Sequence, residues 1–174
     1  ATISHCLITG NSSTVFGGGL ACYNASPIIT DCIFSNNTSY SGGGMANGFG
    51  GMPVVTNCLF IDNTATYFAG GGGLFSQNTS MTLTNCTFSG NSPESIHCNV
   101  AINISNCVIW GNSLNFYNAN AGISNCIIEG GYNLCNNCPN GNGNANPLFV
   151  NTATGDLRLQ ACSPAINAGN DANN

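Results

Sequence analysis

A short motif that begins with cysteine recurs along the chain and constrains the fold more than any other feature. Five copies read Cys-x-Ile/Phe-x-x-Asn, and a sixth, degenerate copy ends in Gly131 instead of Asn. Successive copies start 26, 26, 28, 21 and 19 residues apart, so the motif is the fixed part of each repeat and the length differences lie in loops. Repeats of this length predict a solenoid. The six repeat cysteines are Cys6, Cys32, Cys58, Cys86, Cys107 and Cys126.

Apolar residues at fixed offsets from each cysteine predict which side chains enter the core. An apolar residue stands three positions before every repeat cysteine, and Ile or Phe stands two positions after it. Because side chains alternate along a strand, the cysteine and the residue two positions later share the inner face. Asp or Asn directly precedes five of the cysteines and predicts a corner between two short strands. These corner residues are Asp31, Asn57, Asn85, Asn106 and Asn125.

Glycine-rich segments lie between the cysteine motifs and predict a tight bend before a third strand. They read Gly17-Gly-Gly-Leu20, Gly42-Gly-Gly-Met45 and Gly70-Gly-Gly-Gly-Leu74, and Ile96 and Leu114 take the apolar place in later copies. Each repeat is then a triangle of three strands, and stacking at about 4.8 Å satisfies both its backbone and its apolar face. A doubly wound α/β fold would need helical patterns between the strands, and the sequence has none.

The sequence therefore predicts an all-β fold, a right-handed parallel β-helix of about seven coils with no substantial helix. We expect a single domain over residues 1–174, with regular coils at 1–130, a loop rich in Gly, Asn and Cys at 131–146, and a closing coil at 147–174.

An asparagine follows each of the first five repeat cysteines by five positions. Stacked amides can hydrogen-bond along the stack, as they do in cross-β structures. The alternative is that each asparagine only occupies a left-handed turn. We favour the ladder, because a turn position would often be filled by Gly and only the last copy shows Gly. The column comprises Asn11, Asn37, Asn63, Asn91 and Asn112.

The charge composition excludes several classes of partner. The chain has no Lys and a single Arg, and charged residues make up 4% of it. A nucleic-acid partner is excluded, because phosphate binding needs clustered basic residues, and docking on anionic lipid is disfavoured for the same reason. No stretch approaches the roughly 20 apolar residues of a membrane-spanning helix, which argues against membrane insertion. The 11 Cys and the absence of Lys predict an extracellular or cell-surface protein.

The Phe-Ser-Asn-Asn37, Phe-Ile-Asp-Asn63 and Phe-Ser-Gly-Asn91 segments, alternating with the glycine-rich segments, resemble the FxxN and GGA[ILV] repeats of the polymorphic outer-membrane protein family of adhesins and autotransporters. More broadly they resemble the right-handed parallel β-helix repeat proteins of the pectate-lyase-like superfamily. The likeness covers residues 1–130, and residues 146–169 resemble the closing segment of secreted β-helix proteins. The resemblance implies the fold but does not select a function, because such proteins include adhesins, S-layer-like components and polysaccharide-active enzymes.

The sequence predicts no catalytic site, metal site or cofactor. Elimination of the pectate-lyase type needs a strong base beside Ca²⁺-binding acids, but Arg158 is the only candidate, and we expect it to pair with Asp156 at the surface. Glycoside hydrolysis needs two facing carboxylates, and Asp31 and Asp62 fall in different columns of successive coils.

The cysteines outside the repeat positions are the candidates for disulfide bonds. Cys135 and Cys138 flank two asparagines in the predicted loop, and either they bond to each other or one of them bonds to Cys162 or Cys98. We interpret the six repeat cysteines as small buried hydrophobes, although inter-coil disulfides are not excluded by distance alone.

The leading functional hypothesis is a non-catalytic structural or adhesive surface protein that polymerises head to tail. No amphipathic capping helix precedes the first rung, so its apolar Ile3 and Ile8 are expected to accept the terminal coil of a second copy, through Leu157, Leu159 and Ile166.

The competing hypothesis is a β-helix that binds or degrades a polysaccharide. It would use aromatic residues in the loops as a sugar-stacking face, and the alternative for these aromatics is packing on the outer wall of the rod. The candidate residues are Tyr40, Phe49, Tyr67 and Phe68.

Overall fold

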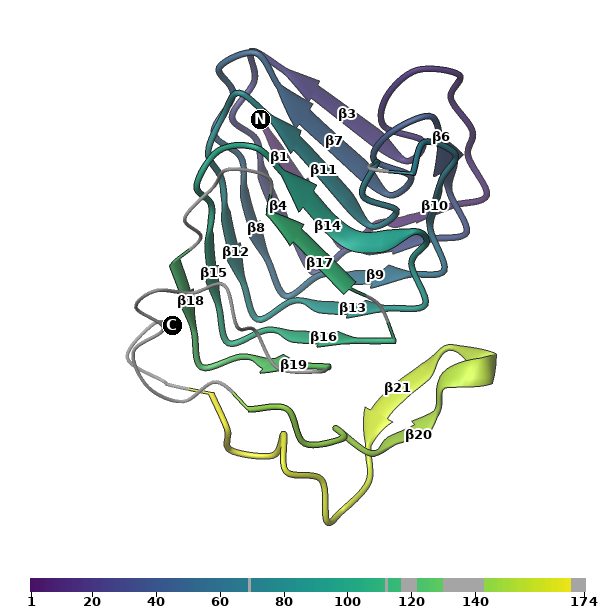
Figure 1. Ribbon diagram of the computed structural model, residues 1–174, viewed down its shortest axis with the longest axis vertical. Helices are drawn as coiled ribbons and strands as arrows, with labels where there is room; N and C mark the ends of the chain where they lie inside the picture. Colours follow the sequence, from purple (N-terminus) through teal and green to yellow (C-terminus); the bar gives the residue numbers. More distant parts are fainter. Residues whose placement is uncertain (69, 112, 117–121, 130–142, 170–174) are drawn as a thin grey trace.

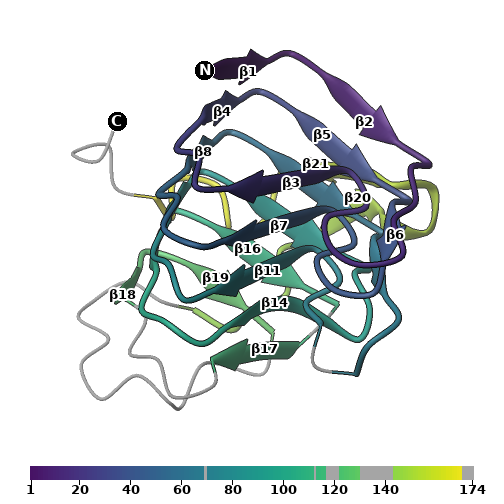
Figure 2. The same cartoon turned by 90° about the horizontal axis from the view of Figure 1, so that it is seen from above.

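The computed structural model describes residues 1–68, 70–111, 113–116, 122–129 and 143–169. Within them the chain winds into a triangular stack whose three walls are parallel β-sheets (Figures 1 and 2). Every neighbouring pair of strands in these walls is parallel, which confirms the predicted all-β solenoid. The only helical element described is one 3-10 turn, η1 (Thr152–Thr154).

Each wall takes one strand from each coil. The first sheet consists of β1 (Thr2–Ser4), β4 (Ile28–Thr30), β8 (Val54–Thr56), β12 (Thr82–Thr84), β15 (Asn103–Ser105) and β18 (Gly122–Ser124). The second consists of β2 (Leu7–Thr9), β5 (Ile33–Ser35), β9 (Leu59–Ile61), β13 (Thr87–Ser89), β16 (Val108–Trp110) and β19 (Ile127–Ile128). The third consists of β3 (Leu20–Tyr23), β7 (Met45–Gly48), β11 (Leu74–Gln77), β14 (Glu94–Cys98) and β17 (Ser113–Phe116).

The solenoid has fewer coils than the seven expected. Two of the sheets have six strands each and the third has five, so the described residues form at most six coils. The closing coil expected over 147–174 is instead an antiparallel hairpin, in which β20 (Phe149–Asn151) pairs with β21 (Asp156–Leu159) in a sheet of their own. A second small sheet pairs β6 (Thr38–Ser39) with β10 (Thr64–Ala65) in the loops.

The corners between the first and second sheets have a uniform backbone conformation. The residue before each repeat cysteine has a positive φ of 53° to 55° in all six coils. Asp and Asn tolerate this left-handed region better than other non-glycine residues, which explains their choice at five of the six corners. The six corner residues are His5, Asp31, Asn57, Asn85, Asn106 and Asn125.

The core is a column of stacked apolar side chains inside the triangle. The rings of Phe34, Phe60 and Phe88 stack with centroids 4.8 and 4.6 Å apart and planes within 2° of parallel, and all three are fully buried. The third sheet closes against them through glycine: a Cβ on Gly73 would lie 2.9 Å from the Phe88 ring and 2.7 Å from the Ser95 carbonyl oxygen. Glycine therefore lets the third sheet approach the aromatic stack.

The asparagine column forms a buried amide ladder beside this aromatic stack. The Nδ2 atoms of Asn11, Asn37 and Asn63 each donate to the Oδ1 of the asparagine one coil further along, at 3.0–3.1 Å. The backbone N–H of each donates to the same oxygen at 3.0–3.1 Å. The second Nδ2 hydrogen of Asn37, Asn63 and Asn91 goes to a main-chain carbonyl oxygen of the previous coil. Asn112 lies outside the described residues.

Candidate functional site

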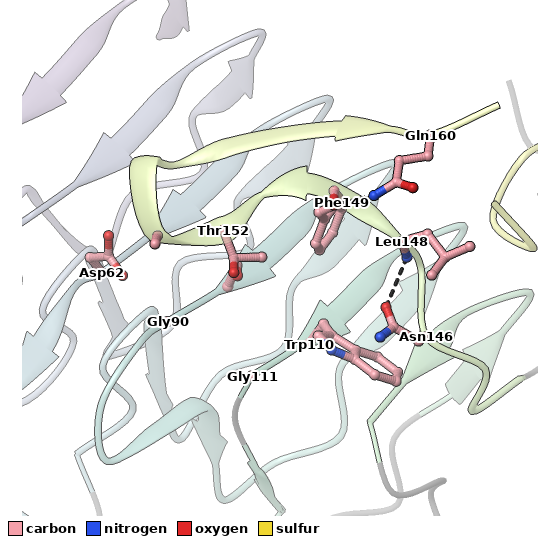
Figure 3. A pocket seen from close by; sticks show the side chains of 11 residues that line it. Asp62, Gly90, Trp110, Gly111, Asn146, Leu148, Phe149, Thr152 and Gln160 are labelled. Atoms are coloured by element: carbon pink, nitrogen blue, oxygen red, sulfur yellow. Dashed lines mark hydrogen bonds between the residues drawn. The ribbon is translucent and has the colours of Figure 1, made fainter. Parts of the chain in front are cut away.

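A pocket of about 500 Å³ lies between the C-terminal hairpin and the outer face of the second sheet (Figure 3). The hairpin lies beside the stack rather than inside it (Figure 1), so its β20 strand and η1 turn wall the pocket on one side. The solenoid supplies Asp62, Ser89, Gly90, Trp110 and Gly111. The hairpin segment supplies Asn146, Leu148, Phe149, Thr152, Ala153 and Gln160.

Strand alternation explains how the solenoid presents its pocket residues. Phe88 and Ile109 point into the core in register with each other, so the next residues along, Ser89 and Trp110, are displayed outward. The corner that follows brings Asp62, Gly90 and Gly111 into one column over three successive coils, since Ile61, Ser89 and Trp110 are register partners.

Local hydrogen bonds hold the hairpin side of the pocket. Asn146 accepts a hydrogen bond from the Leu148 N–H through Oδ1 at 2.8 Å, and the Gln160 Nε2 donates to the Phe149 carbonyl at 3.1 Å. The Asn151 side chain caps the η1 turn by accepting from the Ala153 N–H at 3.1 Å. The buried Ser163 hydroxyl donates to the Pro147 carbonyl. These hydrogen bonds hold the hairpin wall of the pocket in place relative to the segments directly before and after the hairpin.

Gly90 leaves space for the carboxylate of Asp62. The Asp62 side chain leans over Gly90, where an added Cβ would collide with its Oδ1 atom, and Gly90 has a φ of +65°, in the region that disfavours side chains. Asp62 itself sits in a left-handed corner with φ of 52°. Its carboxylate has no ion-pair or hydrogen-bond partner among the described residues, so it is available to a ligand.

The pocket combines one indole ring and one carboxylate with neutral amides and hydroxyls. Trp110 is partly exposed and has no ring-stacking partner among the described residues, so its surface is open to a ligand. Asn146 and Gln160 supply amides, and Ser89 and Thr152 supply hydroxyls that both donate and accept hydrogen bonds. An apolar platform ringed by a few polar groups is typical of small-ligand sites, and the volume lies within their range of roughly 300–1,000 Å³.

A family model described as the right-handed beta helix region matches residues 1–130. This match covers well over half of the 174-residue chain. The chain belongs to the right-handed β-helix family. No curated protein and no solved structure matched significantly. The family includes both enzymes and non-enzymes, and its fold is consistent with surface or polysaccharide-related proteins.

The four aromatic residues predicted as a sugar-binding face of this β-helix fall into two separate groups. Tyr40 and Tyr67 stack with centroids 5.0 Å apart, and Phe68 lies against Tyr67 at 4.7 Å. Phe49 instead contacts Tyr23, in a group that continues through Phe16 to Phe75 and His97. Stacking of Tyr40 on Tyr67 occupies a face of each ring, which leaves Phe68 and Phe49, 77% and 59% exposed, as the open rings.

The single arginine of the β-helix lies apart from the pocket lining. Arg158 donates to both carboxylate oxygens of Asp156, at 2.9 and 2.7 Å, and is 81% exposed. The hydrogen bond from Arg158 lowers the pKa of Asp156. The guanidinium is therefore engaged in a surface pair. No group of three or more His, Cys, Asp or Glu side chains able to hold a metal occurs in the described part of the chain, and no described helix is long and apolar enough to cross a membrane.

The repeat cysteines line the inner side of the first corner, except at the first coil. Cys32, Cys58, Cys86, Cys107 and Cys126 are buried, and Cys6 is exposed. Each buried thiol donates to the carbonyl oxygen two residues earlier, at 3.2–3.3 Å, so the cysteine satisfies a carbonyl group at the corner. In-register stacking holds neighbouring Cβ atoms about 4.8 Å apart, beyond the roughly 3.5–4.5 Å that a disulfide needs.

Cys98 and Cys162, the predicted partners of Cys135 or Cys138, both carry free thiols in this structure. Cys98 points into the core from β14, whereas Cys162 is exposed beyond the hairpin. Cys135 and Cys138 lie outside the described residues, so a bond between these two stays a prediction.

Thiol labelling is expected to separate surface from core cysteines. Only the thiolate reacts, and burial raises the pKa of Cys98 to about 12, so its thiol stays protonated until the pH rises towards that value. In the folded protein near pH 8, Cys6 and Cys162 should react with iodoacetamide, and Cys98 should not. Mass spectrometry of peptides labelled with and without denaturant measures this. Equal labelling of Cys98 and Cys162 in the folded state would contradict the buried position of Cys98.

The residues predicted to join copies end to end lie in different surroundings from those expected. Ile3 and Ile8 are partly buried on β1 and β2, which form the outer strands of their sheets. Leu157 and Leu159 belong to the antiparallel hairpin rather than to a parallel coil, and Ile166 is an exposed residue after it. These three residues therefore lie outside the parallel coil that was expected to stack on β1 and β2. Head-to-tail association stays a prediction.

Sequence reasoning missed the pocket residues, with the exception of Asp62, which it considered as a catalytic acid. Two features of the sequence do mark residues of the pocket. Trp110 is the only Trp of the chain, and it stands on an outward position where the other coils carry Thr9, Ser35, Ile61, Ser89 and Glu129. The Asp62 column also changes to glycine at Gly90 and Gly111. Neither signal locates the hairpin that completes the site.

Proposed function

We propose that this β-helix is a non-catalytic, extracellular adhesive module that binds a glycan in the hairpin pocket. The observation that carries the proposal is the open Trp110 ring in a pocket whose other polar groups are mainly neutral amides and hydroxyls. Sugar rings present an apolar face that packs on an aromatic ring, together with hydroxyl groups that pair with amides and hydroxyls of the protein. The chain's low charge and high Asn, Ser and Thr content are in keeping with an extracellular location.

The pocket lining supports binding rather than cleavage. Glycoside hydrolysis uses two carboxylates about 5–9.5 Å apart. Asp62 is the one acid among the residues that line the pocket in the described part of the chain. The strong base of a lyase mechanism is also missing from this lining. Arg158 does not line the pocket, and it pairs with Asp156. The rigid solenoid then serves to display the pocket.

Fluorescence of the single Trp gives a direct test. Because Trp110 is the only tryptophan, a ligand that enters the pocket should shift or quench the intrinsic emission. We expect saturable changes with soluble oligosaccharides. Calorimetry should show that Trp110→Ala weakens binding at least about tenfold, as loss of a buried aromatic contact in a binding site does.

Phe49→Ala is the matched control, because Phe49 is an exposed aromatic outside the pocket lining and its removal should leave binding unchanged. If no glycan in an array of neutral, amino and acidic sugars changes the Trp110 emission, or if Trp110→Ala binds as well as the unmodified protein, the proposal is wrong.

A further inference from the structure

We infer that the glycan bound in the hairpin pocket carries a free amine and spans at least two sugar rings, with Asp62 as the group that selects the amine. This inference rests on the proposed function and assigns the ligand class to the same pocket. It follows from three properties of Asp62, namely its missing partner, its position over Gly90, and its separation from Trp110 along the stack.

The carboxylate of Asp62 has no partner in the described part of the protein. The other four described acids each contact another group: Asp31 lies 3.8 Å from His5, Glu94 lies 3.1 Å from His97, Asp156 pairs with Arg158, and Glu129 accepts a hydrogen bond from the Gly111 N–H at 2.7 Å. Asp62 has no such neighbour, and the formal net charge of the chain is −5. A ligand ammonium group would supply the missing positive charge.

The carboxylate is also placed to meet a ligand. Asp62 leans over Gly90 within the pocket lining, and the two glycines of its column, Gly90 and Gly111, carry no side chain that could cover it. Figure 3 shows Asp62 near the η1 side of the pocket and Trp110 near Asn146 and Leu148. Asp62 and Trp110 thus lie at opposite ends of the pocket.

The register of the second sheet gives the separation of these two ends. Ile61, Ser89 and Trp110 are register partners on successive strands, so the Asp62 corner lies two coils from the corner after Trp110. Two strand spacings amount to about 10 Å. With the backbone positions that carry these two side chains this far apart, we expect a chain of at least two sugar rings to contact both Trp110 and Asp62. A monosaccharide therefore engages one end only.

The chemistry of the lining distinguishes amino sugars from neutral and acidic ones. An ammonium group donates charge-assisted hydrogen bonds to a carboxylate, which are roughly twice as strong as neutral ones. Acetylation of the amine removes that charge while leaving the ring and its hydroxyls for Trp110, Asn146 and Gln160. A uronic acid would bring a second negative charge beside Asp62 and be repelled.

The test follows Trp110 emission during titration with four probes: the glucosamine trisaccharide, the N-acetylglucosamine trisaccharide, the galacturonic acid trisaccharide and the glucosamine monosaccharide. At low salt and slightly acidic pH, we expect the glucosamine trisaccharide to bind at least about tenfold more tightly than its N-acetylated counterpart. The galacturonic acid trisaccharide and the monosaccharide should bind more weakly than both.

Asp62→Asn is the decisive variant. Asn36 occupies the same corner position one coil earlier with φ of 53°, so Asn at residue 62 is compatible with the backbone, and circular dichroism verifies the fold. We expect this variant to lose the preference for the free amine while keeping its affinity for the N-acetylated trisaccharide. Gly90→Ala, which displaces the Asp62 carboxylate, should reduce the same preference.

The outcomes separate the two proposals. If N-acetylated and free-amine trisaccharides bind equally, or if Asp62→Asn keeps the tenfold preference, the amine assignment is overturned while glycan binding stands. If the monosaccharide binds as tightly as the trisaccharide, the two-ring span is overturned. If none of the probes or other arrayed glycans perturbs Trp110, the proposed function itself fails.

Discussion

Replacing Asn63 by alanine is expected to destabilise the protein by at least about 3 kcal/mol. The Asn63 side chain makes four hydrogen bonds in the fully buried centre of the ladder, to Phe34, Asn91 and twice to Asn37. Its loss leaves the Phe34 carbonyl oxygen, the Asn37 N–H and one Asn37 amide hydrogen without partners. Each buried polar group left unpaired costs about 1–3 kcal/mol. Urea unfolding followed by circular dichroism measures the change.

Asn11→Ala is the matched control for this prediction. Asn11 belongs to the same ladder, but it is exposed and donates to Asn37 without accepting from another asparagine. Water can take the place of the Asn11 side chain as a hydrogen-bond partner of Asn37, so we expect the free energy of unfolding to fall by only about 1 kcal/mol. Equal destabilisation by Asn11→Ala and Asn63→Ala would show that burial does not set the strength of the ladder.

Replacing Phe60 by alanine is expected to cost about 3–5 kcal/mol, the range for deletion of a large buried ring. Phe60 is the middle ring of the aromatic stack and contacts Phe34 on one face and Phe88 on the other. The parallel strands on both sides prevent the cavity from closing, because their spacing is fixed by backbone hydrogen bonds. Thermal and urea unfolding give the change in the free energy of unfolding.

Two variants frame the Phe60 result. Phe60→Leu keeps most of the volume and should cost much less than alanine, and Phe49→Ala, at an exposed ring, should change stability by no more than about 0.5 kcal/mol. If Phe60→Ala were as mild as Phe49→Ala, the stack would not contribute to stability in the way its burial indicates.

The repeated part of the fold follows from the sequence because each coil has the same local environment. The residue before a cysteine meets the same corner in every coil, and the residue two positions after it meets the same core. Thus the spacing from Cys58 to Phe60 and Asn63 is sufficient to predict a corner, an inward ring and a stacked amide. Because each coil contacts only the coils next to it, the structure of a repeated coil can be predicted without knowing the rest of the chain.

The candidate site does not follow from the sequence, because it forms where the repetition ends. Asp62 and Trp110 are 48 residues apart in the chain and in different coils, and the pocket exists only because residues 143–163 turn back along the second sheet as a hairpin. No repeat determines where that hairpin lies.

The sequence by itself determined the solenoid, its corners and the identity of its core columns. The tertiary structure decided the number of coils, the free state of Cys98 and Cys162, and the position of the hairpin beside the wall. The physical reason is that stacking depends on contacts between equivalent residues of adjacent coils, whereas the position of the hairpin depends on non-equivalent residues far apart in the chain, such as Phe149 and Trp110, which line the pocket from its two sides.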